Sequence, residues 1–146
     1  MRCTGDLEAN GFLEDATTIW CGVFKDLDTL EVHSFEPDQL SDMCTFLDSV
    51  EFLAIHNGIA YDIPLLESIL DYTFKGEVFD TYIVSQMTEP DRVGGHGLAP
   101  WGEKFGVPKP KHEDWTQFSP EMLHRCEQDV EINYLVYKQL MRELYD

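Results

Sequence analysis

Short apolar and β-branched stretches in the first half of the chain predict strands. Asn10-Gly11 and the aspartates from Asp26 to Asp28 supply turn residues between the first three stretches. The fourth is a continuous apolar run, typical of a strand buried on both faces. The five predicted strands are residues 2–8, 17–24, 29–35, 51–56 and 78–79.

Apolar positions three or four residues apart predict helices after the third strand and throughout the second half. Pro64 lies in the first turn of one helix, and Ser119-Pro120 begins the last one as N-cap and first helical residue. Three consecutive strands followed by alternating helices and strands indicate an α/β fold, a mixed β-sheet with helices on both faces. The predicted helices are residues 37–47, a segment from about 62 to 70, and residues 81–88, 98–105 and 119–144.

The length of 146 residues suits a single domain, 1–146, whose 43% apolar residues can build a core. Charges interrupt every apolar run, so we expect no membrane association. The N-terminus has no signal peptide pattern, which favours the cytoplasm. The four cysteines show no zinc spacing, and reduced thiols are expected, with two disulfides as the alternative.

The net charge of −18 argues against a nucleic-acid partner. The charge is unevenly distributed, however. Residues 1–50 hold 11 acidic and 2 basic residues, whereas residues 89–126 hold 6 acidic and 5 basic ones. Half of the positive charge therefore lies in a quarter of the chain, and bound divalent cations would offset the acidic remainder.

Asp6 and Glu8 are two positions apart on the first predicted strand, so both side chains leave the same face. Their Cα atoms would lie roughly 6.7 Å apart. Two carboxylates at this spacing can bracket a pair of cations about 3.5–4 Å apart, as two-metal phosphodiester chemistry requires. A solvated strand face would give the same D-x-E string.

Asp62 follows the buried strand 51–56 through an Asn57-Gly58 turn and stands at the start of a helix. Ligand sites in such sheets gather where strands end, so this carboxylate is well placed for binding. Capping of the helix N-terminus is the structural alternative for Asp62, as packing is for Tyr61. Capping of the following helix is also expected for Asp80.

Asp129 lies on the last predicted helix between Cys126 and Val130, and Ile132 shares its face. An acidic residue among apolar neighbours should point inward, where it needs a cationic partner. Glu127 and Glu131 are expected on the solvated side.

These segments resemble a known family. The order D-x-E, N-x-x-x-Y-D and H-x-x-x-x-D is similar to the three exonuclease motifs of the DnaQ-like 3′→5′ exonucleases of the DEDD superfamily. The match is closest to the proofreading domain of phage-type family A DNA polymerases and covers nearly the whole chain. It includes Asp6 to Asn10, Asp80-Thr81, Gly95 to Leu98 and Trp101-Gly102.

The resemblance implies a ribonuclease H-like fold in which Asp6, Glu8, Asp62 and Asp129 bind two Mg²⁺ or Mn²⁺ ions. The related polymerase domains have a tyrosine four residues before the last aspartate, where this chain has Arg125. His124 fits the histidine variant and can accept a proton near neutral pH, so it is the expected general base. The residues expected to contact substrate are Asn57, Tyr61, His96 and Arg125, although a turn would equally explain His96.

The implied reaction releases nucleoside monophosphates from 3′ ends of single-stranded DNA. The protein would work alone or proofread beside a separately encoded DNA polymerase, in the host cytoplasm if a phage encodes it. RNA degradation on the same fold is one alternative. Another is a non-catalytic acidic protein that mimics DNA, which the net charge favours but the metal-binding spacing does not.

Overall fold

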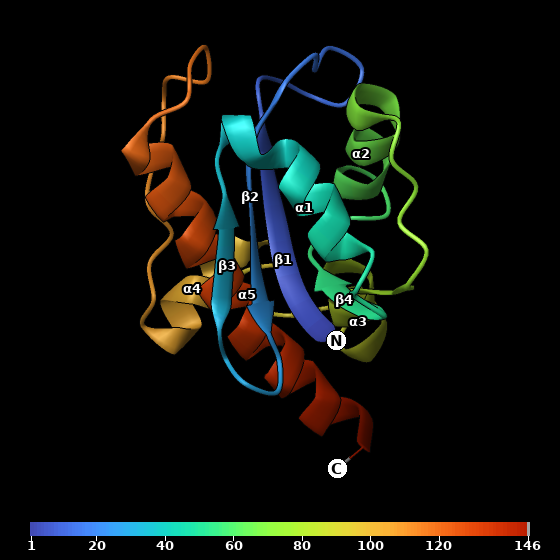
Figure 1. Cartoon of the computed structure of the whole chain (residues 1–146). Helices are drawn as coiled ribbons and strands as arrows, with labels where there is room; N and C mark the ends of the chain where they lie inside the picture. The colour runs from blue at the N-terminus through green and yellow to red at the C-terminus, as the bar shows by residue number, and fades with distance from the viewer. Residues whose placement is uncertain (146) are drawn as a thin grey trace.

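A computed structural model describes residues 1–145 of the chain, and its centre is a five-stranded sheet (Figure 1). The strand order is β3-β2-β1-β4-β5. The pairs β1–β2 and β2–β3 are antiparallel, whereas β1–β4 and β4–β5 are parallel. The strands are β1 (Arg2–Ala9), β2 (Ile19–Asp26), β3 (Val32–Phe35), β4 (Phe52–Ile55) and β5 (Glu77–Asp80).

Helices cover both faces of this mixed sheet, which confirms the predicted fold class. Figure 1 shows α1 and α2 in front of the sheet and α5 behind it. Helix α5 packs on β1 and β2, and α3 and α4 pack against α5. The helices are a 3₁₀ turn (Pro37–Gln39), α1 (Leu40–Leu47), α2 (Asp62–Leu70), α3 (Thr81–Thr88), α4 (Leu98–Phe105) and α5 (Pro120–Tyr145).

Side chains of β1 enter the packing layers on both faces of the sheet, because successive residues of a strand point to opposite faces. Cys3 and Leu7 point into the apolar core beneath α1 and α2. Thr4 faces α5, where its hydroxyl accepts a hydrogen bond from Asn133 at 3.0 Å. Asp6 and Glu8, an even number of residues from Thr4, therefore lie on the α5 face as well.

A buried polar network anchors α5 to the sheet. Asn133 donates from Nδ2 to the Thr4 hydroxyl and to the Ala54 carbonyl, at 3.0 and 3.3 Å. Its Oδ1 accepts from the Thr81 hydroxyl at 2.6 Å. One side chain thus connects β1, β4, α3 and α5, and it fixes the register of α5 against the strands.

No helix in residues 1–145 is long and apolar enough to cross a membrane. Trp101 of α4 is buried, and its ring stacks on that of the partly buried Phe105 with centroids 5.7 Å apart.

Candidate active site

Strand β1 carries Asp6 and Glu8 to the point where it runs past the end of β4. Both carboxylates face α5, as the sequence spacing predicts. Their oxygens and Cys126 Sγ of α5 can all lie within 4.8 Å of one another. Three side chains with ligand atoms thus meet between one strand and one helix.

Asp62 occupies the place beside β1 where β4 has already ended. Strand β4 ends at Ile55, and the Leu7 amide, further along β1, donates to Asp62 Oδ2 at 3.0 Å. Asp80 holds the intervening turn, because its carboxylate accepts from the amides of Asn57 and Ile59 at 2.9 and 3.2 Å. Asp80 also caps α3 by accepting from the amides of Tyr82 and Ile83, so its predicted capping role is confirmed.

Asp129 points inward from α5 and is only 3% exposed. Its Oδ1 is buried and has no hydrogen-bond partner within residues 1–145. An unpaired buried carboxylate oxygen is costly unless a cation or a proton satisfies it. The expectation that this acid turns toward the interior is therefore met.

The four carboxylates form one electrostatically coupled group. Burial, then Glu8, Asp129 and Asp62, raise the pKa of Asp6 well above its usual range. Burial raises the pKa of Glu8 to about 7, although Arg125 opposes the shift, and it raises the pKa of Asp62 to about 8. Burial also raises the pKa of Asp129, and Lys109 opposes it. Without a cation, the site retains protons near neutral pH.

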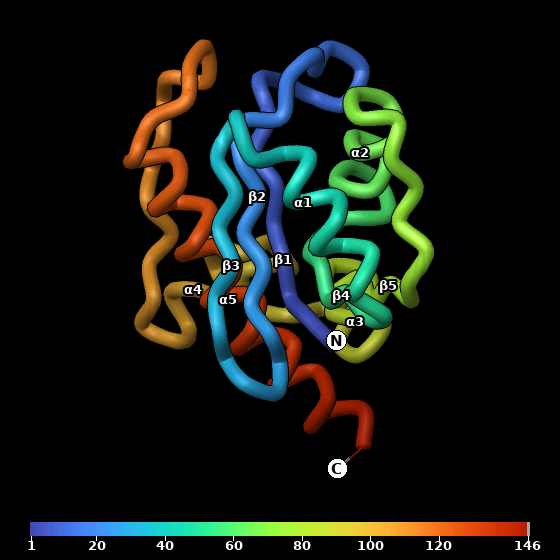
Figure 2. Tube along the Cα trace, viewed as in Figure 1, coloured from blue at the N-terminus to red at the C-terminus, as the bar shows by residue number. Residues whose placement is uncertain are grey.

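Two cationic side chains reach this group. Arg125 Nη1 lies 3.0 Å from Glu8 Oε1, and Lys109 Nζ lies 3.8 Å from Asp129 Oδ2. Lys109 belongs to the 106–119 segment, which runs beside the N-terminal half of α5 (Figure 2). Arg125 Nε ties that segment to α5 by donating to the Pro110 carbonyl at 3.2 Å. Lys109 was not identified as a site residue from the sequence. Only the cluster of basic residues in this part of the chain pointed to it.

The structure does not bring His124 to the carboxylates. His124 is exposed, and five residues of helix place it about 140° from Asp129 around α5. Arg125, four residues before Asp129, has the inward orientation instead. The general-base role of His124 stays a prediction.

The other three residues predicted to contact substrate differ in their surroundings. The Tyr61 hydroxyl donates to the Gly11 carbonyl at 2.8 Å, and burial, with a smaller effect of the nearby carboxylates, raises its pKa. The Asn57 side chain is exposed, and its backbone has a φ of 58° in the turn. His96 has Nδ1 2.7 Å from the Ser85 hydroxyl and Nε2 3.2 Å from the Pro90 carbonyl. The contacts of His96 favour the turn role over a phosphate contact.

Two grooves flank the carboxylates. One, of about 430 Å³, is mainly apolar and lies between the turn after β1 and the 106–119 segment; Phe12 at its edge is 77% exposed. The other, of about 490 Å³, has cationic side chains. Residues Ala9, Asn10, Gly11, Phe12, Tyr61 and Trp115 line the first, and the second includes Lys109, Pro110, Lys111, His112 and Arg125.

The donor set fits a hard divalent cation. All four carboxylates offer oxygen, the ligand that Mg²⁺ and Mn²⁺ prefer. The unpaired Asp129 oxygen and the retained protons are further signs that positive charge is needed here. Asp6, Glu8, Asp62 and Asp129 are the residues that would hold the ions.

No protein-family model matches the chain. The DNA-directed DNA polymerase of Escherichia phage T7 is 26% identical over 187 aligned positions, which cover 94% of this chain and 26% of the polymerase. The polymerase of Enterobacteria phage T3 is 25% identical over the same shares. The chain therefore spans about a quarter of the length of these relatives.

Solved structures share the fold at lower identity. The chain matches Brucella melitensis NrnC with bound Mg²⁺ at a TM-score of 0.72 and 20% identity, over 98% of this chain and 73% of NrnC. It matches Phi29 DNA polymerase complexed with single-stranded DNA at a TM-score of 0.64 and 14% identity, over 100% of this chain and 32% of that one. Fold and sequence similarity support the resemblance seen in the motifs: the chain has a ribonuclease H-like fold and is similar in sequence to part of the phage DNA polymerases.

Proposed function

We propose that the chain hydrolyses the terminal phosphodiester at the 3′ end of single-stranded DNA and uses two Mg²⁺ or Mn²⁺ ions. The observation that carries this proposal is the group of four coupled carboxylates, which three separate segments bring to one end of the sheet; three of them are buried and Asp6 is half-buried. Such a group is unfavourable as a purely structural core, because its negative charges repel one another and resist burial.

The proposed chemistry divides among the residues of the site. Asp6, Glu8, Asp62 and Asp129 would hold the ions, whose chemistry would be to lower the pKa of an attacking water and to offset the charge on the leaving 3′ oxygen. Arg125 and Lys109 lie beside these carboxylates and are placed to pair with the phosphate that is cleaved. His124 stays our candidate for the group that takes the proton from the water. From its exposed position it can approach the carboxylates only from the edge of the site.

The two grooves support a single-stranded substrate. Trp115 and Tyr61 line the apolar groove, and aromatic rings stack unpaired bases with a gain of about 1–3 kcal/mol each. Lys109 and Lys111 in the neighbouring groove can neutralise backbone phosphates. Phi29 DNA polymerase, which has a similar fold, was solved in complex with single-stranded DNA, and this supports the same ligand for this chain.

RNA degradation is the second candidate. Stacking and phosphate pairing serve both sugars, and NrnC, which has a similar fold, was solved bound to pGG. A DNA-mimic role is less favoured, because a mimic must display its acidic groups, whereas Asp62 and Asp129 are 2% and 3% exposed.

The similarity to the phage polymerases supports a role in proofreading. We propose that the chain removes mispaired 3′ ends beside a DNA polymerase domain, encoded with it or separately. A mispaired primer terminus should then be shortened faster than a paired one, because its end is already unstacked.

One experiment tests the proposed reaction: 5′-labelled single-stranded DNA and RNA of the same sequence are incubated with Mg²⁺, Mn²⁺ or EDTA. We expect a ladder shortened from the 3′ end with either ion, faster on DNA, and no reaction in EDTA. Circular single-stranded DNA is the matched control. Cleavage of the circle would indicate an endonuclease, and full activity in EDTA would refute the metal assignment.

A further inference from the structure

Cys126 is a sulfur donor inside a group of oxygen donors. It lies one helical turn before Asp129 on α5 and is completely buried. Its Sγ is 3.4 Å from Asp6 Oδ2 and 3.4 Å from the Asp6 carbonyl oxygen. The thiol therefore faces the carboxylates from the helix side.

The spacing of these donors suits a single ion. Ligand atoms of Asp6, Glu8 and Cys126 all lie within 4.8 Å of one another. Two ligands of one tetrahedral zinc ion, at about 2.0–2.3 Å each, lie roughly 3.3–3.8 Å apart, so modest side-chain rotations would bring these atoms to one ion. The buried Asp129 Oδ1 lacks a partner in the described part of the chain, and this carboxyl is electrostatically coupled to Asp6 and Glu8 beside the group.

Sulfur changes which ions such a group prefers. Mg²⁺ takes oxygen ligands, whereas thiolates favour softer ions such as Zn²⁺. A group with oxygen ligands alone would bind a soft ion weakly. Replacing one oxygen ligand by sulfur raises the affinity for soft ions but not for Mg²⁺. Cys126 is therefore the residue that could distinguish this site from one made of four carboxylates.

We propose that Cys126, together with Asp6 and Glu8, forms a binding site for a thiophilic divalent cation, Zn²⁺ or Cd²⁺, which competes with Mg²⁺ and blocks the site. The inference rests on the proposed metal site of the exonuclease. On ligation, the S–H bond breaks, a sulfur–metal bond forms and the proton passes to solvent. No electrons are transferred, so no oxidant is needed.

Cd²⁺ binding tests the inference without a nuclease assay. The wild-type protein, purified free of metal, is titrated with Cd²⁺ while the ultraviolet sulfur-to-metal charge-transfer band is recorded. We expect one saturable band, which Cys126→Ser removes while the Cd²⁺ concentration for half-saturation, followed by calorimetry, rises about tenfold or more. Cys44→Ser on α1, a half-buried thiol beneath the other face, is the control and should keep the band. A band that survives in Cys126→Ser, or no band in the wild type, overturns the inference.

The wild-type protein provides a second measurement that does not depend on a variant folding. Because both ions need Asp6 and Glu8, added Mg²⁺ must raise the Cd²⁺ concentration that half-saturates the band. If added Mg²⁺ leaves the half-saturating Cd²⁺ concentration unchanged, the inference is overturned. Failure of the proposed nuclease would look different: the Cys126-dependent band would stand, but Mg²⁺ would support no cleavage of labelled DNA.

Discussion

Asp129 has the environment that should respond most to a bound cation, because one of its oxygens is buried without a partner in residues 1–145. We expect Asp129→Asn to lose the rise in melting temperature that Mg²⁺ or Mn²⁺ gives the wild type, since ions stabilise the folded state by mass action. Cleavage of labelled DNA should fall by at least about a hundredfold, the equivalent of about 2.7 kcal/mol of transition-state stabilisation.

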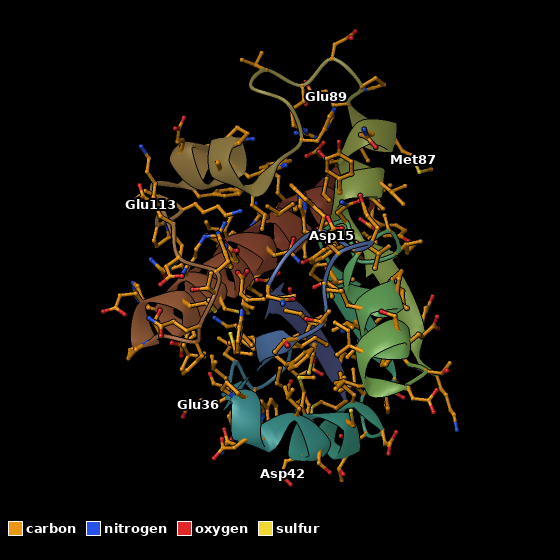
Figure 3. All side chains as sticks on the ribbon, turned by 90° about the horizontal axis from the view of Figure 1, so that it is seen from above. Asp15, Glu36, Asp42, Met87, Glu89 and Glu113 are labelled. Carbon is orange, nitrogen blue, oxygen red and sulfur yellow. The ribbon has the colours of Figure 1, made fainter. Side chains whose placement is uncertain are left out.

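The matched control is Asp42→Asn, which removes the same charge from an exposed site on α1. Figure 3 shows Asp42 on the far side of the molecule from Glu113 of the 106–119 segment. This variant should keep both the metal response and the activity. If Asp129→Asn also keeps both, Asp129 binds no metal.

His124 and Arg125 are neighbours with different expected effects. A positioned general base contributes about 10²–10⁴ in rate, so His124→Ala should lose that much turnover while KM for DNA stays close to the wild-type value. Arg125→Ala should raise KM for DNA instead, because the guanidinium beside Glu8 is placed to pair with a phosphate of the substrate. A His124→Ala enzyme within a few-fold of wild type would remove histidine from the mechanism, as its exposed position already suggests.

The site was predictable from the sequence only where one element holds neighbouring residues. The spacing of Asp6 and Glu8 on a strand, and the apolar neighbours of Asp129 on a helix, fix their directions locally. Lys109 and Cys126 were missed as site residues for a different reason. Lys109 comes from a loop whose path is set by tertiary contacts, and Cys126 matters only because β1 carries Asp6 next to it.

Among elements, hydrophobic periodicity located every strand and helix, but local polar contacts decided where they end. Strand β3 begins at Val32 and not at residue 29, because Leu30 has a φ of 67° in the turn after β2. Strand β2 begins at Ile19, since the Asn10 side chain accepts from the amides of Thr17 and Thr18. Such side-chain-to-backbone bonds leave no periodic signal.

Asn133 makes the element arrangement testable. We expect Asn133→Ala to lower the free energy of unfolding by about 2–4 kcal/mol, because the Thr4 and Thr81 hydroxyls and the Ala54 carbonyl lose a buried partner. Urea unfolding measures the change. Gln139→Ala, at a partly exposed position of the same helix, should stay within about 0.5 kcal/mol. Equal effects of the two variants would mean that the network does not anchor α5.

For the whole molecule, retained protons link stability to pH. The folded-state pKa values of Glu8 and Asp62, about 7 and about 8, lie above their usual values of 4.5 and 3.8. The stability that these protons provide is complete below the unfolded-state values and is lost as pH rises through the folded-state values. In EDTA, the melting temperature should therefore fall between about pH 5 and pH 8.5.

Asp62→Asn should flatten this dependence, because one raised pKa disappears. Mg²⁺ should reverse the dependence in the wild type, since the ion takes the place of the protons as pH rises. Differential scanning fluorimetry across the pH range checks both statements. A melting temperature in EDTA that rises with pH would show that the carboxylates are already ionised in the folded state.

The acidic net charge limits how the molecule holds DNA. Lys109, Lys111 and Arg125 can neutralise about three phosphates, which predicts a slope of log K against log salt of roughly −2 for single strands. Lys111→Ala should reduce this slope by about 0.7, whereas Lys75→Ala, beside β5, should not. Fluorescence anisotropy with the Asp129→Asn protein avoids cleavage, and an unchanged slope in Lys111→Ala would place the DNA elsewhere.

The bond between the Leu7 amide and Asp62 has a consequence for anyone who needs an inactive protein for trapping substrate. Asp62 replaces the strand that β4 does not continue, so Asp62→Ala would leave the Leu7 amide without an acceptor at a cost of about 1–3 kcal/mol. Loss of cleavage in that variant would mix chemistry with weakened folding. Asp62→Asn keeps an oxygen in the same place and removes only the charge, which makes it the cleaner choice for a crystallisable complex with a 3′ end.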